Sequence, residues 1–175
     1  MCIMCEGASR ADVLSDIHRR VLDHGWALQA VRGDPSEPDW VYSIGLAELG
    51  HPELIGAGIG AAQNYPSLMS ELGQRIRHGA RFRVGDEVSL FGQTFGFGDV
   101  HVRHLDDGLV TLWSEYYAWQ PIRPRFAVLQ VIGPAVGCSC GKDHPPCDLS
   151  DPNAAINGRP NRAARQAQRR YRPRR

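Results

Sequence analysis

The five cysteines of this 175-residue chain all lie near its two ends. Cys2 and Cys5 form a Cys-x-x-Cys pair beside the first residue, and a second group begins at Cys138. Residues 6–137 contain no cysteine, and a chain of this length can bury a hydrophobic core of its own. The placement therefore predicts one compact domain whose two ends meet around a metal ion.

The composition is that of a globular protein. Apolar residues make up 42% and charged residues 22% of the chain, which is ordinary for a soluble domain. No apolar run approaches the roughly 18 residues of a membrane span, and the N-terminal residues lack the basic and apolar regions of a signal peptide. We therefore expect a cytoplasmic location, where clustered cysteines more often bind metal or act in redox chemistry than form disulfides.

Positive charge is concentrated at the C-terminal end. The segment Arg159–Arg175 holds eight of the 20 basic residues and none of the 19 acids, which leaves the rest of the chain with a net charge of −7. A basic tail on an acidic body predicts contact with nucleic acid or with an acidic protein partner. The alternatives are a disordered, solubilising extension and a tail that folds back onto its own body.

Local patterns in the first half predict two helices and three strands. Ser9 begins a variant of the capping box, an apolar stripe follows at helical spacing, and Gly25 ends the helix. Three strands are expected next, the first two as a hairpin: residues 26–31, 40–46 and 53–59. A second helix is expected to begin near Pro66 and to end at Gly79.

The second half is richer in strand patterns. Short strands are expected at residues 81–84, 87–91 and 94–101. Residues 109–116 have helical spacing, although their aromatic side chains suit a strand equally well. The apolar run at residues 126–132 is typical of a central, buried strand. The pattern predicts an α+β fold in which a mostly antiparallel sheet packs against two or three helices.

The pattern also divides the chain into three parts. We expect an α+β domain at residues 1–134, a Cys/His-rich knuckle at residues 135–150, and a disordered Arg-rich tail at residues 151–175. Beyond Pro134 the apolar periodicity stops, and Pro, Gly, Asn and Asp dominate. Such a composition is typical of turns and irregular chain rather than of a packed element.

The two cysteine groups have the spacing of metal ligands. Tetrahedral zinc takes four cysteine or histidine donors, and a Cys-x-x-Cys pair lets two thiolates reach one ion. The candidate ligands are Cys2, Cys5, Cys138, Cys140, His144 and Cys147. Either the four C-terminal candidates hold zinc alone, or Cys2 and Cys5 complete a site with two C-terminal thiols. Iron and copper also accept thiolates, and oxidation of Cys2 and Cys5 would instead make the protein a thiol redox sensor.

Several short motifs resemble the signature of a known family. They are Gly25-Trp26, Trp40-Val-Tyr-Ser-Ile-Gly-Leu46, Gly50-His-Pro-Glu-Leu-Ile55, Leu129-Gln130 and the opening Met-Cys-x-x-Cys. Over about residues 2–133 the chain resembles the bacterial family known as domain of unknown function 4262. The resemblance implies an α+β domain of unassigned activity, and the cysteine-rich knuckle lies outside it.

The signature also supplies candidate catalytic residues. Tyr42 and Ser43 lie on opposite faces of the second expected strand, in which Gly45 indicates a bulge or a close backbone approach. His51 and Glu53 flank a proline in the loop before the third strand, where a histidine and a carboxylate can act as an acid–base pair or bind metal. In the simpler interpretation the proline fixes the turn, and His51 and Glu53 satisfy backbone groups around it.

A glycine-rich run after the third strand has a superficial likeness to a dinucleotide-binding loop. The run is Gly56-Ala-Gly58-Ile-Gly60. Its spacing does not fit, and a helix that begins at Pro66 comes too late for a Rossmann turn. We therefore expect no dinucleotide site.

The sequence as a whole predicts a cytoplasmic binding or regulatory module with a zinc site formed by its terminal cysteines. Its partner would be nucleic acid or an acidic protein, bound through Arg159–Arg175, with no membrane contact. The first alternative is a small, hydrolase-like enzyme whose pocket lies around Tyr42, Ser43, His51 and Glu53. The second is the thiol redox sensor.

Overall fold

The computed structural model describes residues 9–31, 39–58, 61–106, 109–121, 123–133 and 148–151. Within these residues one six-stranded sheet forms, in the order β1-β2-β3-β6-β5-β4. Its strands are β1 (Ala27–Val31), β2 (Asp39–Ile44), β3 (Glu53–Gly58), β4 (Glu87–Leu90), β5 (Gln93–Asp99) and β6 (Val128–Ile132). The helices are α1 (Arg10–His24), α2 (Ala61–Arg77), α3 (Val102–Asp106) and α4 (Thr111–Ala118), with a 3-10 turn η2 (Leu46–Leu49).

The sheet is built from two antiparallel meanders. Strands β1, β2 and β3 pair antiparallel in sequence, and β4, β5 and β6 do the same. The parallel pair of β3 with β6 joins the two meanders. The expected mostly antiparallel α+β fold is therefore confirmed, as are the hairpin of β1 with β2 and the central, buried position of β6.

Helix α1 follows directly from its terminal residues. The Ser9 side chain accepts a hydrogen bond from the Asp12 N–H, and the Asp12 carboxylate accepts one from the Ser9 N–H, which makes a complete capping box. At the other end Gly25 has a φ of 90°, the left-handed conformation of a helix C-cap, and its N–H bonds to the Val21 carbonyl. Both predicted ends of this helix are confirmed.

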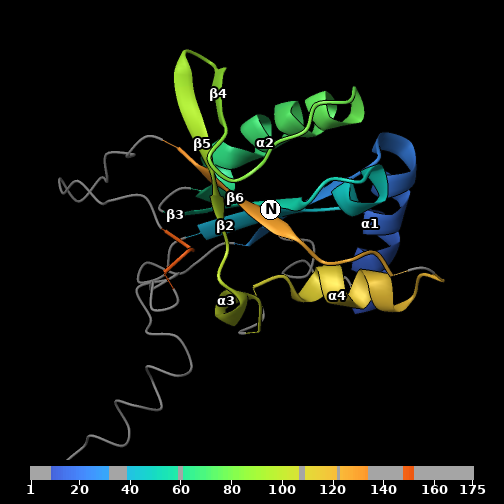
Figure 1. Cartoon of the computed structure of the whole chain (residues 1–175). Helices are drawn as coiled ribbons and strands as arrows, with labels where there is room; N and C mark the ends of the chain where they lie inside the picture. Colours follow the sequence, from blue (N-terminus) through green and yellow to red (C-terminus); the bar gives the residue numbers. More distant parts are fainter. Residues whose placement is uncertain are drawn as a thin grey trace, which may run out of the picture.

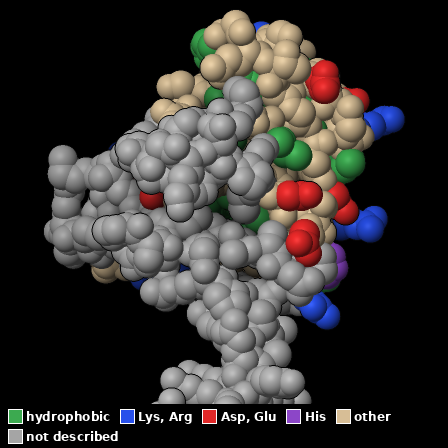
Figure 2. Space-filling view, turned by 90° about the vertical axis from the view of Figure 1, so that its left-hand side faces the viewer, with side chains coloured by type: hydrophobic (Ala, Val, Ile, Leu, Met, Phe, Trp, Pro, Cys, Tyr) green, Lys and Arg blue, Asp and Glu red, His purple; other side chains and the backbone are tan. Residues whose placement is uncertain are grey.

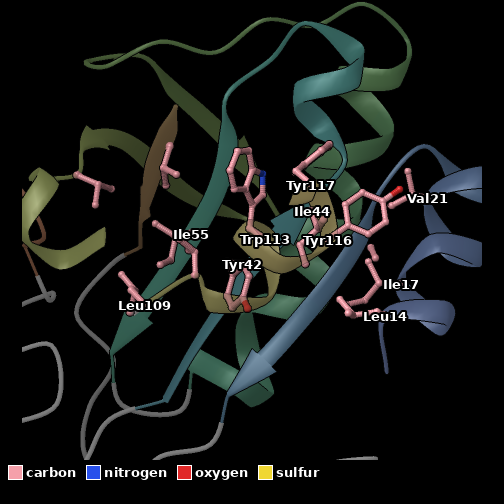
Figure 3. Packing of buried hydrophobic residues seen from close by; sticks show 14 of the residues in the cluster. Leu14, Ile17, Val21, Tyr42, Ile44, Ile55, Leu109, Trp113, Tyr116 and Tyr117 are labelled. Atoms are coloured by element: carbon pink, nitrogen blue, oxygen red, sulfur yellow. The ribbon is translucent and has the colours of Figure 1, made fainter. Parts of the chain in front are cut away.

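Helices cover both faces of the sheet (Figure 1). Helix α2 packs over β1, β2 and β3 on one face. Its buried stripe consists of Leu68, Met69, Leu72 and Ile76. Helices α1 and α4 pack together over the other face, where Leu14, Ile17 and Val21 of α1 lie beside Tyr116 of α4 (Figure 3). Burial of these apolar side chains supplies the main favourable energy of the fold.

Two glycines let α2 come close to the sheet and to its neighbours. A Cβ atom on Gly56 of β3 would lie 2.3 Å from the Tyr65 ring of α2. The Tyr65 hydroxyl accepts a hydrogen bond from the Gly133 N–H just after β6, at 3.2 Å. In the same helix, a Cβ atom on Gly73 would lie 2.4 Å from the Trp26 ring. Glycine is required at both positions because the aromatic rings occupy the space of a side chain.

Four expectations about local structure were wrong. Helix α2 begins at Ala61 and contains Pro66 within it, so it starts earlier than predicted. Residues 81–84 form no strand. The strand expected at residues 94–101 already ends at Asp99, and the short helix α3 follows it. Strand β2 ends at Ile44, and Leu46 belongs to η2. The early start of α2 also removes one reason for excluding a Rossmann turn, although the glycine spacing still does not fit one.

Candidate functional site

The predicted metal ligands all lie outside the described residues. These are Cys2, Cys5, Cys138, Cys140, His144 and Cys147, and the basic tail Arg159–Arg175 lies outside as well. Within the part of the chain that the structure does describe, no group of three or more His, Cys, Asp or Glu side chains is placed to hold a metal ion. The zinc site stays a prediction.

The four signature residues Tyr42, Ser43, His51 and Glu53 are all described, and all are buried. Glu53 is the most enclosed of them, with 1% of its surface exposed at the first position of β3. Ser43 donates a hydrogen bond to Glu53 Oε2 at 2.5 Å, and the Ser43 oxygen accepts one from the Leu54 N–H at 2.8 Å. Ser43 and Glu53, which the sequence placed in one candidate pocket, are therefore in direct contact.

The Glu53 carboxylate holds the turn that follows β2. The N–H groups of Gly45, Leu46 and Ala47 donate to its two oxygens, at 2.9 Å, 3.3 Å and 3.3 Å. Successive backbone N–H groups at the start of a helical turn form a concave anion site. Glu53 supplies the anion from within the chain, so it takes the place that an external ligand would have.

Gly45 makes this turn geometrically feasible. Its φ of 115° lies in a region that side chains rarely adopt. A Cβ atom there would also lie 2.9 Å from the Gly25 carbonyl oxygen and 3.0 Å from the Trp26 Cα atom. The close backbone approach predicted for Gly45 is therefore confirmed, and it brings the Gly-Trp motif against the turn that Glu53 holds.

A tryptophan that the sequence reasoning missed completes the Glu53 site. The Trp113 indole N–H donates to Glu53 Oε1 at 3.1 Å, across 60 positions of sequence. Trp113 lies on α4 among the buried aromatic side chains of that helix, Tyr116 and Tyr117 (Figure 3). Its helical stripe was visible in the sequence, but the pairing of a buried donor with a distant buried acid depends on the tertiary fold.

Burial and hydrogen bonding act against each other on the acidity of Glu53. Burial raises the pKa of this carboxyl above its ordinary value of 4.5. Hydrogen bonds from Ser43, Gly45, Ala47 and Trp113 lower the pKa, but burial is the larger effect. The carboxyl therefore binds a proton more readily in the folded chain than in the unfolded one.

His51 is bound to different groups from those around Glu53. Its Nδ1 lies 2.6 Å from the Pro52 carbonyl oxygen, and its Nε2 accepts a hydrogen bond from the Phe82 N–H at 3.0 Å. This pairing places the ring proton on Nδ1. Burial lowers the pKa of His51 below its ordinary value of 6.5, which favours the neutral ring.

Tyr42 lies in the core on the α1 and α4 face of the sheet. Burial raises the pKa of its hydroxyl, and a hydrogen bond from the Leu112 backbone opposes that shift. The four signature side chains thus have separate partners, apart from the contact of Ser43 with Glu53. Each partner is a backbone group or a core side chain, which is the arrangement of residues that hold a fold.

The exposed surface of the described residues is mixed in character. On the face shown in Figure 2, acidic and basic side chains are interspersed between polar and apolar ones. The large apolar side chains that stay exposed come from different elements: Leu22, Val84, Phe91, Val102 and Trp119. Single exposed apolar residues of this kind are normal on a protein surface.

One family matches the chain. The sequence model described as "Domain of unknown function (DUF4262)" matches residues 20–137, which contain the Glu53 and His51 contacts. No curated protein and no solved structure matches the chain. Among the described residues no helix has both the length and the apolar character needed to cross a bilayer.

Proposed function

The chain belongs to the DUF4262 family, a domain of unknown function, and we propose that it acts as a binding or regulatory module with a zinc site formed by its terminal cysteines. A binding role is supported by the fact that two signature residues, Glu53 and His51, form hydrogen bonds within the fold and are not available for catalysis. Glu53 accepts hydrogen bonds from the N–H groups of Gly45 and Ala47 at η2. His51 is bonded to the Pro52 carbonyl and the Phe82 N–H. Chemistry at this position would require groups that are already committed to the fold.

The C-terminal ligand candidates lie between two anchored points. Gly133 donates to the Tyr65 hydroxyl at the end of β6, and Leu149 is packed into the core with no exposed surface. Cys138, Cys140, His144 and Cys147 fall in the stretch that these two residues enclose. A metal ion bound in such a loop stabilises the folded chain, because the unfolded chain has no formed site. The fixed loop ends also reduce the entropy that is lost when the ligands come together.

Metal content of the untagged protein, purified without chelator, tests the zinc site. We expect about one zinc per chain, by inductively coupled plasma mass spectrometry, because four thiolate or imidazole donors complete a tetrahedral site. A double change of Cys138 and Cys140 to serine should abolish the zinc. The same change of Cys2 and Cys5 distinguishes the two ligand sets: retained zinc assigns it to the C-terminal group alone. A wild-type protein that holds no metal contradicts the proposal.

The basic tail supplies the proposed contact with an anionic partner. Eight arginines in Arg159–Arg175 can neutralise phosphates or carboxylates, and this attraction weakens as salt rises. A gel shift with duplex DNA and with single-stranded RNA, on the full chain and on a chain lacking residues 159–175, tests nucleic acid as the partner. If the full chain and the shortened chain shift the DNA or RNA to the same extent, nucleic acid is ruled out as the partner of the tail.

A further inference from the structure

A four-residue segment near the C-terminal end is inserted into the core of the family domain. This strap, Asp148–Asp151, is the short orange-red trace near α3 in Figure 1. The Leu149 side chain has no exposed surface and joins the core cluster under α1 and α4. Asp148, Ser150 and Asp151 are exposed, so one side chain carries the apolar part of the contact.

The strap is bound through its backbone, in the manner of an extended peptide. The Leu149 N–H donates to Gln130 Oε1 at 2.8 Å, and the Leu149 carbonyl accepts from the His101 N–H at 2.8 Å. The Asp151 carbonyl oxygen lies 2.8 Å from His104 Nε2. Backbone hydrogen bonds combined with one side-chain pocket are the usual means by which proteins hold an extended segment.

Two of the groups that bind the strap are polar side chains in positions where apolar ones are expected. Gln130 lies in the central strand β6 with 1% of its surface exposed, and His104 lies on α3 with none exposed. Buried polar side chains are unfavourable unless they are hydrogen-bonded. The strap backbone supplies a partner to each of them, which gives these residues a reason to be polar.

The fit of the strap leaves one polar atom without a partner. His104 Nδ1 is buried and makes no hydrogen bond with the described part of the chain. An unsatisfied buried acceptor weakens the closed arrangement. Among the described residues, three backbone hydrogen bonds and one buried side chain hold the strap, so its local opening breaks far fewer contacts than global unfolding.

We propose that His101, His104 and Gln130 line a peptide-docking groove, which the strap occupies in cis and from which an extended segment with a leucine displaces it. The groove lies inside the family domain, whereas the strap lies beyond the residues that match the family. Displacement of the strap releases Asp148, which directly follows Cys147, so the C-terminal end of the cysteine-rich stretch loses its attachment to the domain. The groove itself does not depend on a bound metal.

Peptide binding in trans tests the groove. The probe is a fluorescein-labelled, capped peptide with the sequence of residues 148–153, and fluorescence anisotropy reports its binding to the full chain. We expect binding to the Leu149→Asp variant, whose own strap no longer fits. Binding to the wild type should be at least about tenfold weaker, because a tethered strap has an effective concentration in the millimolar range.

Two matched controls make the result specific. A peptide that carries Asp in place of its leucine should not bind either protein. The Leu149→Asp chain with Gln130→Leu added should lose affinity for the normal peptide. No binding by a folded Leu149→Asp chain, judged by its circular dichroism, overturns the proposal, as does equal binding by the two peptides.

Hydrogen exchange in the wild type decides the question even where the Leu149→Asp chain fails to fold. The Leu149 amide, bonded to Gln130, reports opening of the strap, and the buried Leu54 amide, bonded to Ser43, reports opening of the sheet. We expect the Leu149 amide to exchange at least about 100-fold faster, through a local opening. Equal rates with the same dependence on denaturant would mean that the strap leaves only on global unfolding, which overturns the proposal.

Discussion

Removal of the Glu53 carboxylate should destabilise the protein more than any surface substitution. In Glu53→Ala the N–H groups of Gly45, Leu46 and Ala47, the Ser43 hydroxyl and the Trp113 indole lose their acceptor. A buried donor left without a partner costs about 1–3 kcal/mol. Water that enters the vacated space will satisfy part of the set, so we expect a loss of roughly 3–5 kcal/mol in the free energy of unfolding.

Glu53→Gln should have a smaller effect. Its amide oxygen can still accept the hydrogen bonds from Gly45, Ala47 and Trp113, which all reach Oε1. Its amide nitrogen then faces the Leu46 N–H, where two donors meet. We expect a cost between about 1 and 3 kcal/mol, below that of the alanine variant.

Urea unfolding followed by circular dichroism measures these differences. Glu71→Ala is the matched control, because Glu71 is a partly exposed carboxylate paired with Arg75 at 2.9 Å. Its loss should cost no more than about 1 kcal/mol. A Glu53→Ala protein that unfolds within about 1 kcal/mol of the wild type would refute the structural role of the carboxylate.

The pH dependence of the same unfolding free energy gives an independent check on Glu53. Because burial raises the pKa of this group above 4.5, the folded state binds its proton more tightly than the unfolded state. The stability that comes from binding this proton is therefore complete below pH 4.5 and is lost as pH rises through the folded pKa, whereas the hydrogen bonds to the carboxylate remain. The Glu53→Gln variant should lack this slope, and an unchanged slope in the variant would contradict the assignment.

Four further substitutions, of which Gly50→Ala is a control, test the contacts in and around this site. Burial lowers the pKa of His51, so the unfolded state binds more protons and the free energy of unfolding should fall as pH drops below 6.5. The variant His51→Gln can still accept a hydrogen bond from the Phe82 N–H, and urea unfolding should show a smaller pH dependence for it. Gly45→Ala should cost roughly 3 kcal/mol or more, from strain and backbone overlap, whereas Gly50→Ala, with a φ of 72° and open space around it, should cost about 1–2 kcal/mol. Gly73→Ala should lower the melting temperature because its Cβ overlaps the Trp26 ring, and an unchanged melting temperature would show that the ring can move aside.

Local signals accounted for the elements whose determinants lie within a few residues. Ser9 and Gly25 mark the ends of α1 through hydrogen bonds to their own helix. The apolar run of β6 reports burial directly. These elements were predictable because the sequence itself carries their caps and their periodicity.

The start of α2 was not predictable in this way. Pro66 favours a helix start because it lacks an N–H group, yet the helix begins at Ala61 and runs through the proline. The contacts of Tyr65 with Gly56 and Gly133 hold the first turns of this helix against β3 and β6. Tertiary packing here outweighs a local preference, and no local pattern reports it.

The candidate site was predictable in its residues and not in its geometry. The motifs pointed to Ser43, His51 and Glu53, and the sequence favoured a structural role for His51 and Glu53 over an acid–base pair without showing their partners. The contacts of Glu53 with η2 and of His51 with Phe82 depend on how the chain folds back. His104 shows the same limit, since it lies fully buried beneath the strap although no local pattern marks its position as buried.

X-ray absorption at the zinc edge of the full-length protein tests the central claim most directly, that the chain acts through a metal site built from its terminal cysteines. A site made of cysteines with or without one histidine predicts a first shell dominated by sulfur, at about 2.3 Å from the zinc. That shell should disappear with the metal when Cys138 and Cys140 become serine. A shell of oxygen or nitrogen atoms alone, at about 2.0–2.1 Å, would contradict the account.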